Sequence, residues 1–311
     1  MSGPNGIKVW LAQSRANFLI LAVLLVAIGL VYAAKYNFGG DFNPFHAVLL
    51  ILGVVAAHMS VNLLNEYSDY NTRIDFNTIQ TPFSGGSKML IDGHTKPKSV
   101  LAAGLGALLM SLGIGLYFTL ISHWSIIFFV IIGGLTIMFY TNFLAKILMG
   151  EIFAGLTLGT MVVLGTYIAM VANPSMSFGE IIPQEVWLIS IPPGILTSLL
   201  LLLNEFPDAE MDREGGRNHL VIKFGKKVAA YIYAFGLLVT FGTIVILPIA
   251  GISSYWLYLA LLPLPIAFKA GMTAIRHGDD MQKLVPSMGM NVMVVLGTDL
   301  LVAVSVLIGM I

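Results

Sequence analysis

The stretch LLNEYSD at residues 63–69 recurs as LLNEFPD at residues 202–208, 139 residues further along the chain. Each copy closes an apolar run long enough to cross a membrane as a helix, which takes roughly 20 residues. The offset covers about four such runs, so the chain reads as two four-helix halves of parallel orientation followed by a ninth helix. We therefore predict an all-α, polytopic membrane protein of about nine transmembrane helices with an internal four-helix repeat.

The composition indicates a chain that folds in a bilayer. Of its 311 residues, 57% are hydrophobic and 10% are charged, and the mean hydropathy is +0.88. These values lie outside the range of ordinary soluble domains. We expect a single integral membrane domain over residues 1–311. The nine predicted spans lie near 17–34, 46–66, 99–121, 125–143, 151–172, 186–206, 227–249, 253–270 and 288–310.

The basic residues separate the two sides of the membrane. Fifteen of the sixteen lysines and arginines fall on one side of the predicted spans, and Lys35 falls on the other. Because basic loops are retained in the cytoplasm, we predict a cytoplasmic N-terminus and active site, an external C-terminus and location in the cell (cytoplasmic) membrane. The net charge is zero, which gives no indication of a nucleic-acid partner. The absence of cysteine excludes disulfides and thiolate metal sites.

The first copy of the motif gathers polar side chains on one helical stripe. Asn62, Asn65 or Glu66, and Asp69 recur at helical spacing, and Asp75 follows just beyond them. Carboxylates at the end of a membrane span are costly unless they are paired, hydrated or bound to a metal. Any single aspartate here could equally be a solvated loop charge, but the repetition of the motif favours a functional site.

The second copy places Asn204, Asp208 and Asp212 on one stripe, and Pro207 should kink or end the helix there. Hard oxygen ligands of this kind suit Mg²⁺, which proteins hold through one or two carboxylates together with substrate phosphates. With no histidine or cysteine beside the motifs, zinc is not expected. The metal ligands that we predict are Asn65, Asp69, Asp75, Asp208 and Asp212.

A glycine-rich, basic segment follows each motif: TPFSGGSKML at 81–90 and REGGRNHLVIKFGKK at 213–227. Backbone amides in glycine turns and nearby basic side chains are suited to a diphosphate. We expect Lys88 and Arg217 to contact it, although each could equally be an ordinary cytoplasmic-side charge. Neither segment matches a P-loop, so nucleotide hydrolysis is not indicated.

These motifs resemble those of the UbiA superfamily of intramembrane prenyltransferases. The resemblance covers nearly the whole chain and rests on NLLNEYSDYNTRID, on NEFPDAEMD, on Arg15 at the start of the first span and on YTNFLAKILMGE at 140–151. Glu66 stands where the family commonly has aspartate, and GRNH replaces a more usual Gly-Lys-Arg-Thr run. The GGSK segment and the gap from Asp69 to Asp75 are more similar to the branch that prenylates 1,4-dihydroxy-2-naphthoate, in menaquinone synthesis, than to the 4-hydroxybenzoate branch.

The resemblance implies a reaction and a set of contacts. A prenyl diphosphate would bind through Mg²⁺ to both motifs, with its tail in a lipid-facing groove, and a small aromatic acceptor would attack the allylic cation. Basic side chains would stabilise the leaving diphosphate, and the ring face of Tyr140 would stabilise the cation. The residues assigned to the substrates are Arg15, Asn62, Asn65, Glu66, Lys88, Lys146, Asn204 and Arg217. The residues assigned to catalysis are Asp69, Asp75, Asp208, Asp212 and Tyr140.

The sequence leaves alternatives open. An ion-coupled secondary transporter is the competing class, because repeats and intramembrane carboxylates also mark carriers. It predicts polar residues near the bilayer midplane, whereas both motifs lie at one membrane face. Within the enzyme class, the acceptor could also be 4-hydroxybenzoate, haem or a glycerol-phosphate lipid. Asp299, near the middle of the ninth span, is expected to hydrogen-bond to a neighbouring helix, and His58 is expected to pack or hydrogen-bond within the bundle.

Overall fold

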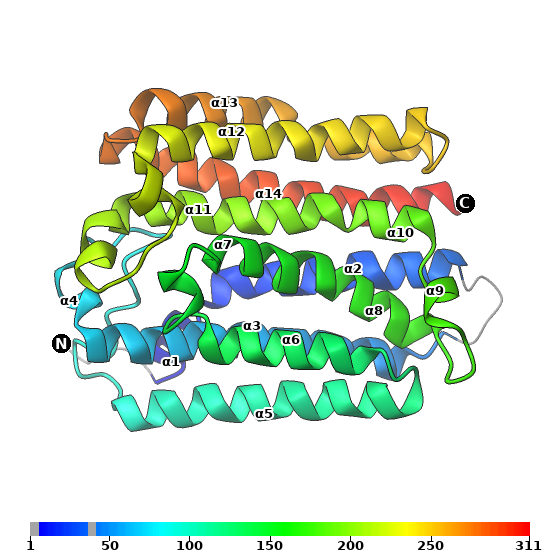
Figure 1. The fold of residues 1–311 in the computed structure, drawn as a ribbon, viewed down its shortest axis with the longest axis horizontal. Coiled ribbons are helices and arrows are strands. Elements are labelled where there is room, and N and C mark those ends of the chain that lie inside the picture. Colours follow the sequence, from blue (N-terminus) through cyan, green and yellow to red (C-terminus); the bar gives the residue numbers. More distant parts are fainter. Residues whose placement is uncertain (1–5, 37–41) are drawn as a thin grey trace.

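The computed structural model describes residues 6–36 and 42–311, and within these ranges the chain is helical and contains no β-strand. The long helices lie roughly side by side in one bundle (Figure 1). The elements up to residue 146 are α1 Gly6–Gln13, α2 Ala16–Tyr36, α3 Pro44–Thr72, α4 Ile74–Asn77, α5 Pro97–Ile121, α6 Ile126–Phe139 and the 3₁₀ turn η1 Leu144–Lys146. Those that follow are α7 Gly150–Phe153, the π-helix η2 Ala154–Thr160, α8 Met161–Val171, α9 Phe178–Ile181, α10 Gln184–Ile189, α11 Ile191–Glu214, α12 Leu220–Ile249, the 3₁₀ helix η3 Tyr255–Leu261, α13 Leu264–His277 and α14 Met281–Gly309.

The described residues contain seven helices long and apolar enough to cross a membrane, which confirms the predicted class of polytopic helical membrane protein. Two of the seven are compound: α7, η2 and α8 run together, as do α10 and α11. The pair η3 and α13 would add an eighth span, but it is bent by 40° at a break next to Pro263. Helix α6 has 14 residues, so it rises about 21 Å, short of the roughly 30 Å of a hydrocarbon core. The nine-span count and the internal repeat therefore remain predictions.

Both motif helices continue past the predicted ends of their spans. Helix α3 runs to Thr72 and α11 runs to Glu214. Pro207 lies inside α11, so it does not end the helix. A proline inside a helix removes one hydrogen bond, and the extensive burial of α11 offsets this loss. As a result, Asp208 and Asp212 both stand on one continuous helix.

Small residues bring η2 against α11. A Cβ added at Gly159 would lie 2.5 Å from the Gly194 Cα and 2.9 Å from the Pro193 carbonyl oxygen. Such contacts are typical where membrane helices approach closely. Helix α7 directly precedes η2, and the Ser198 hydroxyl of α11 donates to the Glu151 carbonyl of α7 at 2.7 Å. The packing therefore holds α7 next to the second motif helix.

Asp299 lies in α14 with a fully buried side chain. Neither of its carboxyl oxygens has a hydrogen-bond partner among the described residues, and the same holds for the hydroxyls of Thr298 and Thr240. The predicted hydrogen bond from Asp299 to a neighbouring helix is therefore wrong. His58 is buried in the bundle, as predicted.

Replacing Gly159 by alanine should destabilise the protein by about 1–3 kcal/mol, because the new methyl group overlaps the backbone of α11. Gly106 on α5 has open space around its Cβ position, so Gly106→Ala is a matched control. That control should be neutral or stabilising by about 0.5–1 kcal/mol. Thermal unfolding in detergent measures both changes, and equal melting temperatures for the two variants would contradict the close approach of η2 and α11.

Candidate active site

A cavity of about 370 Å³ lies among the helices and joins the two motifs. Its wall follows α3 from Leu50 to Asp69, a rise of roughly 28 Å for a helix of that length. The polar end is lined by Arg15, Asn62, Asn65, Asp69, Asp75, Asn204, Asp208, Asp212 and Arg217. The apolar part includes Val54, Leu108, Ile114, Phe118, Phe129 and Val130. An elongated cavity with one charged end and one apolar end suits an amphiphilic ligand.

The end of α11 folds Arg217 back onto the acidic residues. Gly216 has φ +81°, and its N–H donates to the Arg213 carbonyl at 3.1 Å, while the Arg217 N–H donates to the Asp212 carbonyl at 2.9 Å. This pair of hydrogen bonds is a Schellman motif, which needs a left-handed residue and therefore favours glycine. The glycine turn thus directs Arg217 towards the carboxylates instead of away from the bundle.

Arg217 links the two motifs. Its guanidinium forms ion pairs with Asp69 of the first motif and with Asp212 of the second, where Nη1 lies 2.8 Å from Oδ1. Asn65 completes the contact: with its amide oxygen towards Arg217, it accepts from Nη2 at 3.0 Å and donates to Asp69 Oδ2 at 3.3 Å. Burial lowers the pKa of Arg217, but the two carboxylates raise it by more, so the guanidinium stays charged. Two motifs far apart in the sequence therefore form one site.

The segment after the first motif packs onto carboxylates from both motifs. The Gly85 N–H donates to Asp208 Oδ2 at 3.1 Å. A Cβ on Gly86, whose φ is +69°, would overlap the Asp75 carboxylate. Glycine is needed at both positions, for the backbone conformation and for the close approach. The GG pair therefore closes the polar end of the cavity over the aspartates.

Three of the predicted substrate contacts do not line the cavity. Glu66 accepts a hydrogen bond at 3.3 Å from a backbone N–H of the GGSK segment. Lys88 Nζ donates to the carbonyls of Asp75 and Thr78, the latter at 2.8 Å. Lys146 is exposed on the surface. Glu66 and Lys88 hold the loop and α4 in place around the site, whereas Lys146 stands apart from it.

The polar end of the cavity contains more carboxylates than its arginine side chains neutralise through ion pairs. Asp208 Oδ1 and Asn204 Oδ1 are buried and have no hydrogen-bond partner in the part of the chain that the structure describes. Burial, and to a lesser degree the charge of Asp69, raises the pKa of Asp75 from 3.8 to about 6. Hard divalent cations satisfy such oxygen atoms and offset their charge, so the residues present fit Mg²⁺.

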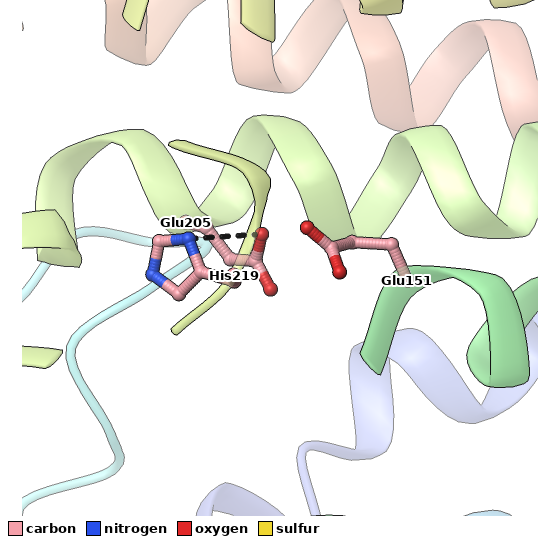
Figure 2. Close-up of side chains that lie close together, drawn as sticks. All are labelled: Glu151, Glu205 and His219. Atoms are coloured by element: carbon pink, nitrogen blue, oxygen red, sulfur yellow. Dashed lines mark ion pairs between the residues drawn. The ribbon is translucent and has the colours of Figure 1, made fainter. Parts of the chain in front are cut away.

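A histidine and two glutamates lie next to Asp212, and Glu205 and His219 also line the cavity; Glu205 was noted beside the second motif, but no histidine was expected there. His219 Nε2 is 3.2 Å from Asp212 Oδ2, and His219 Nδ1 is 3.5 Å from Glu205 Oε2. Glu151 faces them from α7 (Figure 2). The prediction that no histidine lies beside the motifs is therefore wrong. A signal was present, because Glu205 belongs to the second motif and His219 follows it across the glycine turn.

The fold and the cavity define a helical membrane protein whose interior suits an amphiphilic ligand. Its charged end contains carboxylates that fit a divalent cation and arginines that fit an anionic group. The sequence profile of the UbiA prenyltransferase family matches residues 22–293. The chain belongs to this family and is a prenyltransferase. The resemblance seen in the motifs is thereby confirmed, and the competing class of ion-coupled transporter is rejected.

Relatives with assigned names are similar over most of the chain. The 1,4-dihydroxy-2-naphthoate octaprenyltransferase of Bacillus subtilis is 29% identical over 81% of this chain and 77% of its own. The protein of the same name from Escherichia coli is 24% identical over 88% of this chain and 86% of its own. Among solved structures, a UbiA homolog from Aeropyrum pernix K1 shares the fold with a TM-score of 0.71 at 16% identity, covering 95% of this chain and 98% of that one. A UbiA homolog from Archaeoglobus fulgidus bound to GPP and Mg²⁺ has a TM-score of 0.56 at 16% identity, covering 95% and 99%.

Magnesium binding should weaken in acid. Because the pKa of Asp75 is raised to about 6, a proton occupies this carboxyl below that pH and competes with the cation, whereas above it the carboxylate is free. The apparent dissociation constant for Mg²⁺ should rise roughly tenfold per pH unit below about pH 6 and level off above it. Isothermal titration calorimetry across this range measures the change. Asp75→Asn should reduce this pH dependence, and a pH-independent affinity in the unmodified protein would contradict the assignment.

Proposed function

We propose that the protein transfers a polyprenyl group from a prenyl diphosphate to a small aromatic acceptor similar to 1,4-dihydroxy-2-naphthoate, with Mg²⁺ as its cofactor. The observation that carries the proposal is that both aspartate motifs reach one cavity, where Arg217 joins Asp69 to Asp212. The cavity offers a charged end for a diphosphate and an apolar wall for an isoprenoid chain. The choice of acceptor is supported by two relatives that are named 1,4-dihydroxy-2-naphthoate octaprenyltransferases.

The acidic end of the cavity is proposed to hold the diphosphate through Mg²⁺. Asp69, Asp75, Asp208 and Asp212 supply carboxylate ligands, and Asn65 supplies its amide oxygen. The buried, unpartnered Oδ1 of Asp208 supports this role. When bound, Mg²⁺ neutralises the charge that develops on the leaving diphosphate as its C–O bond breaks.

Arg217 and Arg15 supply positive charge at the same end of the cavity. With Asp69 and Asp212 engaged by a metal ion, the Arg217 guanidinium would be free to donate to diphosphate oxygens. Arg15 lines the cavity close enough to Asp75 to stabilise its carboxylate, and it is the second donor that we propose. Both charges act in an interior of low dielectric constant, where electrostatic stabilisation is strongest.

The remaining predicted residues divide into contacts and supports. Asn62 donates to the Ser14 carbonyl at 2.9 Å and lines the cavity, as does Asn204. Lys88 and Glu66 are proposed to act through the loop and α4 that they hold. A contact of Lys146 with the diphosphate stays a prediction, and it would require movement of the segment that carries this exposed side chain.

The apolar wall is proposed to bind the isoprenoid tail. Along α3, the side chains that line the cavity change from Asp69, Asn65 and Asn62 to Val54 and Leu50. Tyr140 lies at the cavity wall, and its ring face can stabilise an allylic cation without supplying a nucleophile. The electron-rich ring of the acceptor then attacks the allylic carbon and forms the new C–C bond; diphosphate leaves with the electron pair of the broken C–O bond, and the attacked ring carbon releases a proton, or carbon dioxide where it carries a carboxylate.

We propose a single membrane domain with nine spans, formed by the seven long helices, by α6 with the turn that follows it, and by the bent pair η3–α13. The two motif loops meet at the end of the bundle marked by α4, opposite the end that carries α10 (Figure 1). Lys35 lies near α10, where it pairs with Glu185 at 2.5 Å. The basic loops beside the motifs support a cytoplasmic active site and N-terminus, an external C-terminus and residence in the cell membrane.

Prenyl transfer is tested with purified protein, Mg²⁺, prenyl diphosphates of several lengths and a panel of acceptors, with products identified by mass spectrometry. We expect prenylated 1,4-dihydroxy-2-naphthoate, whose formation stops with EDTA and returns with Mg²⁺ or Mn²⁺. If only 4-hydroxybenzoate, haem or a glycerol-phosphate lipid were prenylated, prenyl transfer would be supported, but the proposed naphthoate acceptor would be excluded. Full turnover without metal would reject the role of Mg²⁺.

In the same assay, Asp69→Asn and Asp208→Asn should each slow single-turnover transfer by several orders of magnitude. The double variant should be little worse than either, because residues that act as a unit are strongly non-additive. Glu185→Gln, which changes a buried carboxylate at the opposite end of the bundle, is the matched control and should retain activity. Multiplicative losses in the double variant would show that the two motifs act independently.

The proposed topology predicts that cysteines introduced at two exposed serines label from opposite sides of the membrane. The Ser99→Cys variant, at the start of α5, should react with an impermeant thiol reagent in inverted vesicles. The Ser175→Cys variant, between α8 and α9, should react with it in right-side-out vesicles. The chain contains no other cysteine, so labelling reports each site directly. Labelling of both positions from one side would exclude the proposed number of spans between them.

A further inference from the structure

Glu151, Glu205 and His219 form a compact cluster next to the aspartate site, and Glu205 and His219 also line the cavity. One ligand atom from each lies within 4.8 Å of the others, and the side chains converge from α7, from α11 and from the residue that precedes α12 (Figure 2). All three residues are buried, with exposed fractions of 2%, 9% and 2%. Helix α7, which is distant in the sequence, and the two consecutive elements α11 and α12 therefore direct hard and borderline donors to one point.

The ligand atoms that face one another in this cluster lack hydrogen-bond partners, and the contact of His219 Nδ1 with Glu205 Oε2 is an ion pair only when the imidazole is protonated. Glu151 Oε2, Glu205 Oε2 and His219 Nδ1 are buried and form no hydrogen bond to the described residues. The other oxygen of Glu151 is already used, because it accepts from the Leu220 N–H at 2.7 Å. Within the described chain, no lysine or arginine forms an ion pair with either glutamate. A buried, unpaired group of this kind is costly unless a cation or a proton satisfies it.

The hydrogen bond on the far side of the imidazole determines which nitrogen is free. His219 Nε2 lies 3.2 Å from Asp212 Oδ2, and an aspartate that also pairs with Arg217 accepts hydrogen bonds without donating. In the neutral tautomer that this hydrogen bond favours, the proton is on Nε2 and the Nδ1 lone pair is directed at Glu205. A histidine that donates one N–H to a carboxylate and offers its other nitrogen is the usual arrangement of a metal ligand.

We infer that Glu151, Glu205 and His219 form a second cation site, for a divalent transition-metal ion such as Zn²⁺. Two ligands of a tetrahedral ion with bonds of about 2.1 Å lie roughly 3.4 Å apart, and His219 Nδ1 is 3.5 Å from Glu205 Oε2. Imidazole nitrogen favours zinc and its neighbours over Mg²⁺. This site is distinct from the aspartates proposed to hold the diphosphate, and it does not depend on the identity of the prenyl acceptor.

The ion would connect the fold to the active site. It would tie α7 and α11 to the start of α12, and through the His219 ring it would fix the position of the Asp212 carboxylate. His219 is thus a positioning residue for Asp212. Loss of the ion would leave the aspartate site in place but less rigid.

The inference is tested on full-length protein in detergent, stripped of metal and kept in excess Mg²⁺ to occupy the aspartate site. Titration with Co²⁺, followed by its visible absorption, should show one ion bound per chain, which Zn²⁺ displaces. Glu205→Gln and His219→Asn should each weaken this binding by at least about tenfold. Asp69→Asn combined with Asp208→Asn should leave it unchanged, which separates this site from the aspartate site and from the outcome of the activity assay.

Two matched controls change a buried residue of the same type elsewhere. Glu185→Gln removes a buried carboxylate in α10, and His123→Asn removes a buried imidazole between α5 and α6; both should bind Co²⁺ as the unmodified protein does. Metal should raise the melting temperature of the unmodified protein and of these controls, but not of the two cluster variants. Absence of Co²⁺ and Zn²⁺ uptake by the unmodified protein, with the glutamates sharing a proton instead, would overturn the inference. Uptake that survives both cluster substitutions would do the same.

Discussion

Buried carboxylates must be matched by positive charge, and the ion pairs of Arg217 with Asp69 and Asp212 meet this requirement where the two motif helices approach. Breaking a buried pair by removing one partner typically costs about 3–5 kcal/mol, because the other charge is left uncompensated. The contact therefore does more than arrange polar groups. It sets how α3 and α11 lie relative to each other at the charged end of the cavity.

Backbone geometry makes this charge pairing possible. The left-handed Gly216 reverses the direction of the chain after α11, so that the side chain of Arg217 points back towards α11. Gly86 allows the loop after α3 to lie directly on the Asp75 carboxylate. The close contact of η2 with α11 then brings α7, and with it Glu151, to the other side of the same helix end. Gly216 is needed for its left-handed conformation, whereas Gly86 and Gly159 are needed because their Cβ positions are occupied by neighbouring atoms.

The division of the cavity into a charged end and an apolar wall follows from the membrane itself. Charged residues are tolerated where a span reaches the interface, and they are costly further in, so the acidic residues gather at the ends of α3 and α11. The wall beyond them consists of apolar side chains, which a membrane-spanning helix contains in any case. An apolar space beside the proposed diphosphate site is the environment in which an allylic cation would survive long enough to meet its acceptor.

The sequence by itself determined the fold class, the two acidic motifs and the glycine-rich segments beside them, because hydrophobic length and helical spacing are local properties of the chain. Only the tertiary structure decided which basic residues reach the carboxylates. Lys88 turns to backbone carbonyls and Lys146 to the surface, while Arg217 enters the site. The direction of a loop side chain depends on the turn that precedes it and on the helices around it, and the spacing of residues in the sequence predicts neither. The same reason explains why His219 lies against Asp212 although the sequence predicted no histidine beside the motifs.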